Sequence, residues 1–419
     1  MKNPGIKFGI LLLFILISCQ ALVRGQQAWT RFRGSDGLGI DTSSNVPESW
    51  DSTDYRWEIS LPGVGHSSPV VWESTIYVNS ADDAKDIGFV SAIDEQDGKV
   101  LWQKDFLIGE LSMHVDNNLA SSTPAVDENH LYVIWYTKEK TILIALAHNG
   151  DLKWKSEFSG IEARHGGGSS LLLTENNVVF TLEQEEGSPF ESAWYAVDKA
   201  TGGIAWKLER ETCTRNSFST PLLLKNDRQE SQLIFTSEAH GFTGVDAETG
   251  QVLWENKGLL THRVVASPVY SDGLVVGCRK GEGVVLAVDL HTSTVADTAL
   301  YTLAPNLSPY VPTPIVVKGL LFLFMDGGSI ACVRLDNGDL LWKERPAGPL
   351  YGSPVCVDDK LYCLTKKGDV LVIRADSSYE LLGINGLGEG SFSTPALSGS
   401  GMVFRTFSKL ILLGNEITK

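Results

Sequence analysis

Six histidine and arginine residues in predicted loops have side chains that could bind an anion or a metal ion. They are His66, Arg164, His165, Arg215, His262 and Arg263. Arginine suits recognition of a carboxylate or phosphate, because its planar guanidinium presents several N–H donors in a fixed fork. Histidine can ligate a metal, and it can also change charge near neutral pH. We interpret these six residues as a candidate ligand-binding set, provided that the fold brings their loops together.

Further polar residues occupy the neighbouring loops. They are His114, His240, Arg279, Lys280, Tyr310, Tyr351, Lys366, Lys367, Glu389 and Arg405. The competing interpretation is that long polar loops at a channel mouth collect such residues without binding anything. A zinc site needs nitrogen or oxygen ligands that converge on one point at roughly 2.0–2.2 Å, which separate loops do not guarantee. We therefore assign no metal ligands.

The motifs of common catalytic classes do not occur in the sequence. It has no Gly-x-Ser-x-Gly elbow, no His-Glu-x-x-His zinc motif, no phosphate-binding loop and no EF-hand spacing. We assign no catalytic residue and expect a binding protein rather than an enzyme.

The elements that must position these loops are repeats. A turn glycine is followed four residues later by a tryptophan in five pairs: Gly98 and Trp102, Gly150 and Trp154, Gly202 and Trp206, Gly250 and Trp254, and Gly338 and Trp342. Glycine accepts the positive φ of such turns. An apolar residue two positions before each tryptophan indicates a strand with one buried face. We expect the tryptophans of the regular repeats to pack between neighbouring sheets.

A second tag gives the number of repeats. A Ser/Thr-Pro step followed by apolar residues begins at Ser68, Thr123, Thr220, Ser267, Thr313, Ser353 and Thr394. Ser170 fills the one double-length gap, with the proline lost. Eight units spaced by roughly 40–55 residues are typical of four-stranded propeller blades. The sequence therefore predicts an all-β fold, an eight-bladed β-propeller of four-stranded antiparallel blades over residues 54–414.

The two ends of this region are predicted to close the ring. Residues 54–60 carry the pattern of a fourth strand without the three that should precede it, and the last repeat stops after three strands. We predict that residues 54–60 complete the last blade, because closure removes open sheet edges. Chain direction then places the loops that enter each innermost strand around one mouth of the central channel. The loops between second and third strands reach the same face.

The N-terminus indicates export. Basic residues precede an apolar run over residues 8–17, which is too short to span a membrane and is typical of a signal peptide. We assign residues 1–25 to the signal peptide and residues 26–53 to an ordered extension. The four residues that end at Cys19 resemble a lipobox, in which Cys19 would be lipidated. Cleavage further along the chain, without a lipid, is the alternative.

Charge and cysteine content narrow the class further. The formal net charge of −16 gives no sequence-wide reason to bind nucleic acid or an anionic membrane surface. Five cysteines remain beyond Cys19, an odd number without a Cys-x-x-Cys motif, and we predict buried thiols. A Cys356–Cys363 bridge across one hairpin is the alternative. We expect a monomer.

The repeat resembles that of the PQQ-like, quinoprotein-type β-propeller family. The resemblance rests on Val245-Asp-Ala-Glu-Thr-Gly250 up to Trp254 and on Val197-Asp-Lys-Ala-Thr-Gly202 up to Trp206, and it covers residues 54–414. One branch of that family contains quinoprotein dehydrogenases, which bind PQQ and calcium. Another contains non-catalytic propellers, including the lipoprotein of the outer-membrane β-barrel assembly machinery (BamB).

The sequence departs from the dehydrogenase branch. It lacks the adjacent Cys-Cys pair common beside that cofactor, and no calcium ligand or catalytic aspartate can be carried over. The resemblance therefore implies a cofactor-free scaffold for envelope proteins, in the periplasm or at the outer membrane of a bacterium. The alternative is a PQQ-dependent oxidoreductase with calcium, or a relic of one that binds a small anion. A deep pocket floored by a tryptophan and lined by His66, Arg164, His165 and Arg263 would favour a small ligand, and a shallow flat rim would favour a protein.

Overall fold

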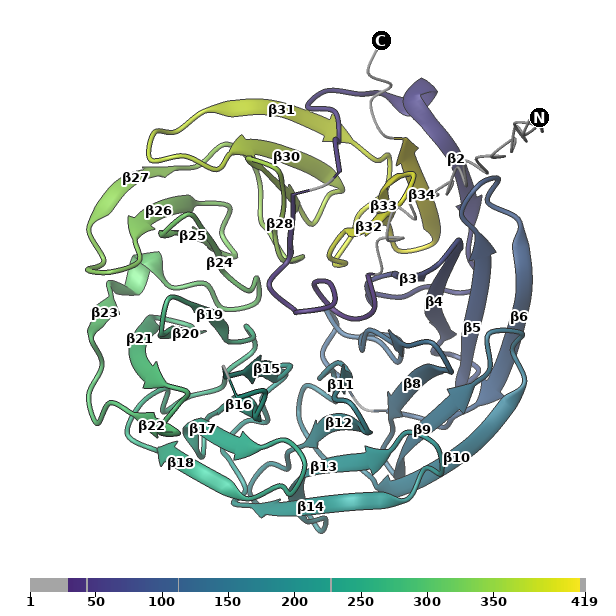
Figure 1. Cartoon of the computed structure of the whole chain (residues 1–419). Coiled ribbons are helices and arrows are strands. Elements are labelled where there is room, and N and C mark those ends of the chain that lie inside the picture. The colour runs from purple at the N-terminus through teal and green to yellow at the C-terminus, as the bar shows by residue number, and fades with distance from the viewer. Residues whose placement is uncertain (1–28, 43, 112, 227, 415–419) are drawn as a thin grey trace, which may run out of the picture.

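Eight antiparallel sheets surround a central channel (Figure 1). The computed structural model describes residues 29–42, 44–111, 113–226 and 228–414. The predicted eight-bladed propeller of four-stranded blades is confirmed. The signal-peptide assignment and the lipidation of Cys19 concern residues that lie outside the described ones. No helix among the described residues is long and apolar enough to cross a membrane.

The blades follow one another in chain order, each running from an inner to an outer strand. Blade 1 contains β3 (Val70–Trp72), β4 (Thr75–Asp82), β5 (Ile87–Asp94) and β6 (Val100–Leu107). Blade 2 contains β7 (Ala125–Val126), β8 (Leu131–Tyr136), β9 (Lys140–Leu146) and β10 (Leu152–Ser159). Blade 3 contains β11 (Leu172–Leu173), β12 (Asn177–Leu182), β13 (Ser192–Asp198) and β14 (Ile204–Arg210). Blade 4 contains β15 (Leu222–Lys225), β16 (Ser231–Ser237), β17 (Gly241–Asp246) and β18 (Val252–Asn256).

Two of the remaining blades carry an additional strand. Blade 5 contains β19 (Val269–Ser271), β20 (Leu274–Arg279) and β21 (Glu282–Asp289), and its outer strand is split into β22 (Thr294–Val295) and β23 (Tyr301–Leu303). Blade 6 contains β24 (Ile315–Val317), β25 (Leu320–Phe324), β26 (Ile330–Arg334) and β27 (Leu340–Glu344). Blade 7 contains β28 (Val355–Val357), β29 (Lys360–Leu364), β30 (Asp369–Arg374) and β31 (Leu381–Gly386), with β1 (Ile40–Asp41) added in parallel to β28. Two 3₁₀ helices, η1 (Ser52–Asp54) and η2 (Pro305–Leu307), lie between strands.

Blade 8 closes the ring with strands from both ends of the described chain. It contains β32 (Ala396–Ser398), β33 (Gly401–Arg405), β34 (Lys409–Gly414) and, as its outer strand, β2 (Tyr55–Ser60). In the antiparallel register of β2 and β34, Trp57 lies opposite Leu412. The prediction that residues 54–60 supply the missing strand is therefore confirmed.

The hydrophobic core lies between the blades. The two middle strands of each blade are buried on both faces, as in β8, because each blade packs against a neighbour on either side. One buried cluster, for example, joins Tyr132 and Leu143 of blade 2 to Phe180 of blade 3. The outer strands keep alternate exposed positions, as β14 does. The five described cysteines are all free and buried, so no bridge joins Cys356 to Cys363.

A closed ring of eight hydrogen bonds links the inner strands. At the start of each blade, a backbone N–H donates to the hydroxyl of the equivalent serine or threonine in the next blade, over 2.9–3.2 Å. In order, the ring residues are Ser68, Thr123, Ser170, Thr220, Ser267, Thr313, Ser353 and Thr394, so serine and threonine alternate. Each bond satisfies a buried N–H that no strand partner reaches. The Ser/Thr-Pro tag thus marks the contact that joins one blade to the next.

The glycine–tryptophan tag also acts between blades. Trp206 packs its ring on Gly250 of the following blade, and its indole N–H donates to the Ala247 carbonyl over 3.1 Å. Trp57, Trp102 and Trp154 dock in the same way on Gly98, Gly150 and Gly202. The glycine and the tryptophan of one tag therefore contact different neighbours. The expectation that these tryptophans pack between sheets is confirmed.

Blades 4 and 5 depart from this pattern. The turn of blade 5 has Ser293 with a positive φ in place of a glycine, so it offers no flat platform to Trp254. The Trp254 ring instead lies over Gly244 of its own blade, and its N–H donates to Gln232 over 3.2 Å. In the next blade, Tyr301 takes the tryptophan position and packs on Gly338.

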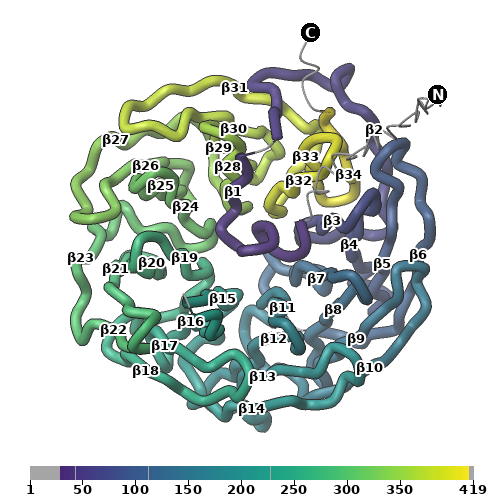
Figure 2. Tube along the Cα trace, viewed as in Figure 1, coloured from purple at the N-terminus to yellow at the C-terminus, as the bar shows by residue number. Residues whose placement is uncertain are grey.

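The N-terminal segment closes one end of the channel. We call residues 29–41 the N-terminal plug. Trp29 exchanges backbone hydrogen bonds with Val71 of β3, and β1 pairs with β28, so the plug contacts inner strands downstream of the hydroxyl ring. Figures 1 and 2 show this segment crossing the centre of the disc before it runs outward over blade 7. Its Phe32 side chain faces the narrow centre of the channel.

Candidate functional site

The channel opens into a pocket of about 780 Å³ on the side of the ring opposite the plug. A narrower space of about 120 Å³ continues from it toward Phe32. The pocket walls come from the loops that enter inner strands and from the loops between second and third strands. We call the side of the disc that carries these loops the loop face. The channel mouth is therefore deep and closed at its inner end, not a shallow rim.

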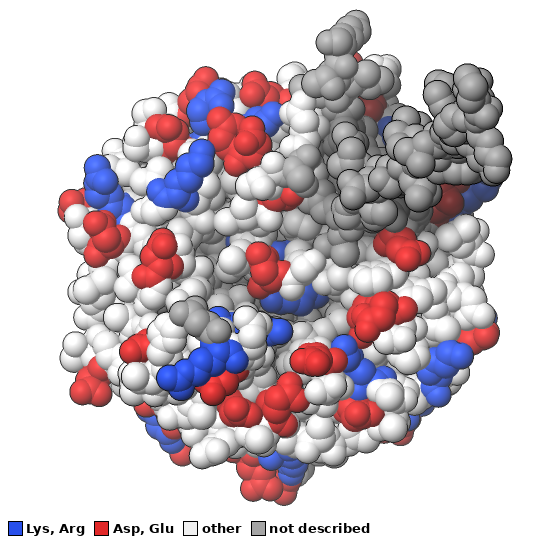
Figure 3. Space-filling view, viewed as in Figure 1, with Lys and Arg blue, Asp and Glu red and all other residues white. Residues whose placement is uncertain are grey.

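Four cations and three carboxylates line the pocket. The cations are Arg215, Arg263, Lys280 and Lys366, and the carboxylates are Asp116, Glu238 and Asp326. Three histidines, His114, His165 and His262, lie among them. This near balance of charge differs from the acidic molecule as a whole. Figure 3 shows acidic and basic side chains interspersed on the other side of the disc, which carries the plug.

The carboxylates of the pocket are engaged with the protein itself. Asp116 forms an ion pair with Lys366 over 3.0 Å. Asp326 accepts hydrogen bonds from the backbone N–H groups of Tyr310 and Val311, and burial raises the pKa of its carboxyl group. These contacts hold the loops in place and leave the other cations without a carboxylate partner.

Arg263 is the central cation of the pocket. Its side chain is buried, with its guanidinium carbon 4.5 Å from the centre of the Phe218 ring. Nε donates to the Asn216 carbonyl over 3.0 Å, and Nη1 donates to the Tyr310 hydroxyl over 3.1 Å. No carboxylate of the described residues forms an ion pair with it. The guanidinium is thus fixed in orientation while its charge stays unpaired.

Aromatic rings form much of the inner wall. Tyr351 stacks on Phe392 with ring centres 4.1 Å apart, and the Lys366 ammonium lies 4.6 Å from the centre of the Tyr351 ring. Phe218 also lines the pocket, with the Arg263 guanidinium over its ring. A flat apolar group entering the pocket would therefore meet rings and cations together.

Burial, with nearby cations, keeps two histidines of the channel neutral. Burial, reinforced by Arg263 and other nearby cations, lowers the pKa of His165 to about 4. Deeper in the channel, burial and then Arg405 lower the pKa of His66 to about 3. Both imidazoles are therefore neutral at pH 7, and their surroundings disfavour a further positive charge.

The structure brings most of the candidate ligand-binding residues together. His165, Arg215, His262 and Arg263 line the wide pocket, and His66 lines the narrow part. Arg164 is in the same loop as His165 but is exposed and lines neither part. Whether any of these side chains binds a ligand remains a prediction.

Several lining residues were outside the predicted set, and a sequence signal existed for some of them. The narrow part of the channel is lined by the residue two positions before each ring hydroxyl: His66, Ser121, Gly168, Phe218, Val265, Val311, Tyr351 and Phe392. Side chains two positions apart in an extended chain point the same way, so the Ser/Thr tag identifies them. Asp116, Glu238 and Asp326 had no such signal, because irregular loops place them.

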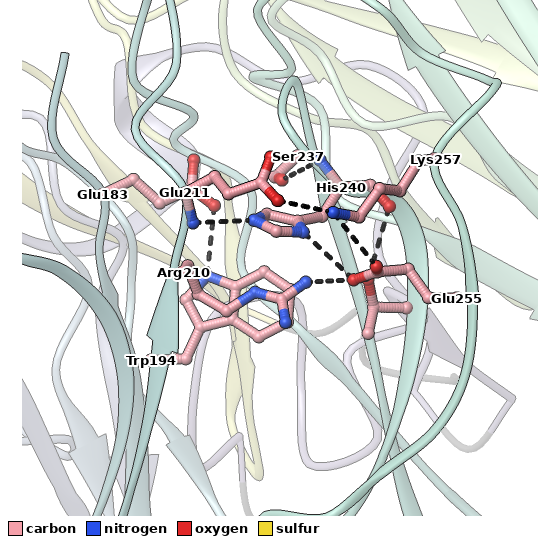
Figure 4. Close-up of polar contacts among 9 residues, drawn as sticks. Glu183, Trp194, Arg210, Glu211, Ser237, His240, Glu255 and Lys257 are labelled. Atoms are coloured by element: carbon pink, nitrogen blue, oxygen red, sulfur yellow. Dashed lines mark hydrogen bonds and ion pairs between the residues drawn. The ribbon is translucent and has the colours of Figure 1, made fainter. Parts of the chain in front are cut away.

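A buried polar network supports one wall of the pocket (Figure 4). Arg210 of β14 lies over the Trp194 ring, 4.3 Å from its centre, and pairs with Glu255 of β18. His240 contacts Glu255 through Nδ1 over 3.0 Å and accepts the backbone N–H of Glu211 through Nε2 over 3.0 Å. The network joins blades 3 and 4.

The same network fixes the loops that carry pocket residues. Glu183 accepts the Trp194 indole N–H over 3.1 Å and the Ser217 backbone N–H over 3.2 Å. Ser217 adjoins Phe218 of the pocket wall, and His240 shares a loop with Glu238. The backbone N–H of Arg215 donates to Glu238 over 3.0 Å, which ties the two loops together.

The protein is expected to become less stable on acidification because His240 and His165 have lowered pKa values in the folded state. Burial, and then the positive charge of Arg210, lower the pKa of His240 from 6.5 to about 4. Burial likewise lowers the pKa of His165 from 6.5 to about 4. Between these values the unfolded chain binds more protons than the folded one, so the free energy of unfolding decreases as pH falls from about 6.5 to about 4. Urea unfolding at pH 7 and pH 5 measures this loss.

The variant His240→Gln should flatten that pH dependence, because the titrating ring is removed. An equal slope in the parent protein and in His240→Gln would contradict the assignment to His240.

The donor set does not fit a calcium-held quinone. Among the described residues, no group of three or more His, Cys, Asp or Glu side chains is arranged to hold a metal ion. Calcium takes six to eight oxygen ligands, whereas the pocket carboxylates are occupied by Lys366 and backbone N–H groups. None of the five described cysteines lines the pocket, and burial raises the thiol pKa of Cys278 to about 12.

Known proteins with related sequences and folds agree with this architecture. The outer membrane protein assembly factor BamB of Yersinia pestis is 21% identical over 378 residues, which are 85% of this chain and 78% of that protein. A europium-containing methanol dehydrogenase superposes with a TM-score of 0.68 at 12% identity, covering 93% of this chain and 90% of its own. BamB from Moraxella catarrhalis superposes with a TM-score of 0.60 at 12% identity, covering 85% of this chain and 98% of that protein's chain. At these identities the structural likeness shows the fold alone.

The family comparison is more specific. The family model described as outer membrane protein assembly factor BamB matches residues 86–300, just over half of the chain. The matched region runs from β5 of blade 1 to β22 of blade 5 and includes the docked Trp102, Trp154 and Trp206 and most of the pocket loops. The chain therefore belongs to the family of the outer membrane protein assembly factor BamB.

Proposed function

We propose that this protein is a non-catalytic binding scaffold of the bacterial cell envelope, which acts with partner proteins in outer membrane assembly. Membership of the BamB family is the observation that carries the proposal. The relatives that support it include the assembly factor of Yersinia pestis. We further propose that the protein is exported to the periplasm, with or without a lipid on Cys19, and works as a monomer.

The asymmetry of the disc supports the loop face as the contact surface. Long segments join the blades there, such as residues 108–124 and 257–268, while the other connections are mostly tight turns. Val115 on the first of these segments is 88% exposed, and Leu107 at its start is 79% exposed.

The second candidate function, a PQQ-dependent oxidoreductase, is favoured by the fold of the dehydrogenases and by the deep pocket at the channel mouth. The residues of the pocket offer neither a set of calcium ligands nor a paired cysteine, and this supports the scaffold. We propose that the protein acts without a resident cofactor.

A photo-crosslinking experiment in the native bacterium tests the scaffold. A photoreactive amino acid replaces Val115 on the loop face or, as the matched control, Arg228, which is exposed in the turn between β15 and β16. We expect one envelope protein to be captured through position 115 and not through position 228. Loss of the protein should also reduce the assembled outer membrane proteins. Capture of nothing at either position, with unchanged outer membrane proteins, would refute the proposal.

A further inference from the structure

The pocket on the loop face has the features of a small-molecule site, which a protein scaffold alone does not require. Its volume of about 780 Å³ lies within the range of ligand pockets, roughly 300–1,000 Å³. The plug and the hydroxyl ring close its inner end, so a ligand enters only from the loop face. A flat protein surface would contact the rim and leave this volume unfilled.

Three of the four cations of the pocket lack partners of the opposite charge, whereas Lys366 is paired with Asp116. Among the described residues, no carboxylate forms an ion pair with Arg215, Arg263 or Lys280. Arg215 and Lys280 are exposed at the mouth, and Arg263 is buried below them. A buried cation without a counter-ion is costly unless something else neutralises it. An anion in the pocket would supply that charge.

The geometry of Arg263 selects the kind of anion. Phe218 covers one face of the guanidinium, and Asn216 and Tyr310 hold Nε and Nη1. Nη2 makes no hydrogen bond within the described part of the chain. A guanidinium held in this way presents its remaining donor in a fixed direction, which suits a carboxylate or phosphate oxygen.

The aromatic wall defines the rest of the ligand. The Tyr351 and Phe392 rings are stacked, and Lys366 covers them while paired with Asp116. A flat apolar body fits against such rings, with cations at its edges. Arg263 would then bind the charged part of one small molecule, and the rings would bind its apolar part.

We propose that this pocket binds a small organic anion, with its carboxylate or phosphate group on Arg263 and a flat apolar body against Tyr351 and Phe218. Arg215 and Lys280 attract the anion to the mouth. No metal takes part, because the charge of the ligand is met by arginine and lysine. The proposal is independent of the scaffold role, since a protein partner can use the rim while the pocket is filled.

Fluorine NMR of small probe molecules, mixed with the protein without residues 1–25, tests the proposal. The probes are 4-fluorobenzoate, 4-fluorophenyl phosphate and the neutral 4-fluorobenzamide, which shares the ring of the first but carries no charge. We expect saturable line broadening with at least one of the two anions and none with the amide. The anion that binds more tightly identifies a carboxylate or a phosphate as the preferred group.

Matched variants locate the site. Arg263→Gln is expected to raise the Kd of the bound anion about tenfold or more, because a charge-assisted hydrogen bond is lost. Lys280→Gln, at an exposed position, should raise it by a smaller factor. Arg228→Gln removes the same charge from the exposed turn between β15 and β16 and should leave Kd unchanged.

Three outcomes would overturn the proposal. They are no binding of either anion, equal binding of the amide, and anion binding that both Arg263→Gln and Lys280→Gln leave unchanged. If Arg263→Gln fails to fold, the comparison of Lys280→Gln with Arg228→Gln decides, since both positions are exposed.

Discussion

Replacing Trp206 by alanine is expected to lower the free energy of unfolding by about 3–5 kcal/mol. The Trp206 ring is 7% exposed and fills the space between blades 3 and 4, where it packs on Gly250. Alanine would leave a cavity there and would also remove the indole N–H that bonds the Ala247 carbonyl. Equilibrium denaturation followed by circular dichroism measures the loss.

Two variants separate the contributions to that loss. Trp206→Phe keeps most of the ring but not the N–H, so the change from the hydrogen bond should be about 1 kcal/mol, with a further cost for the smaller ring. Ile204→Ala changes an apolar residue on the same strand that is 56% exposed, and its effect should stay within about 0.5 kcal/mol. A loss of under about 1 kcal/mol for Trp206→Ala would show that the dock between blades is not stabilising.

Gly250→Ala is expected to destabilise the protein by about 2–4 kcal/mol, through two separate effects. Gly250 has a φ of +74°, which strains any residue with a Cβ atom. An added Cβ would also lie 2.7–2.9 Å from atoms of the Trp206 ring. Gly203→Ala provides the control, because Gly203 is exposed and its nearest neighbour to a new Cβ is 3.4 Å away.

The double variant Trp206→Ala/Gly250→Ala isolates the contact between the two blades. Without the ring, the new methyl group no longer clashes, so the combined loss should be about 1–2 kcal/mol smaller than the sum of the single losses. Additive losses would mean that Gly250 acts only through its backbone conformation and not as the platform for Trp206.

The sequence determines the architecture because its signals are local and repeated. Alternation within a strand, the turn glycines and the Ser/Thr tag each depend on residues a few positions apart, and eight copies give the number of blades. The unpaired strand over residues 54–60 likewise predicts the closure, since a sheet edge needs a partner. The same direction of chain in every blade predicts that His165 and Arg263 share one mouth.

Only the tertiary structure decides which residues touch across blades. Trp206 and Gly250 are on neighbouring repeats. Whether a tryptophan ring packs on the glycine of the next blade depends on the conformation of that blade's turn. Trp254 instead lies over Gly244 of its own blade and donates to Gln232. The plug, which closes the channel, has no strand pattern in its sequence. Its backbone hydrogen bonds are made with β3 and β28 of the propeller. The unpaired charge of Arg263 follows from the positions of Phe218, Tyr310 and every nearby carboxylate at once. Such an environment is set by the packing of several separate loops, and no stretch of sequence contains it.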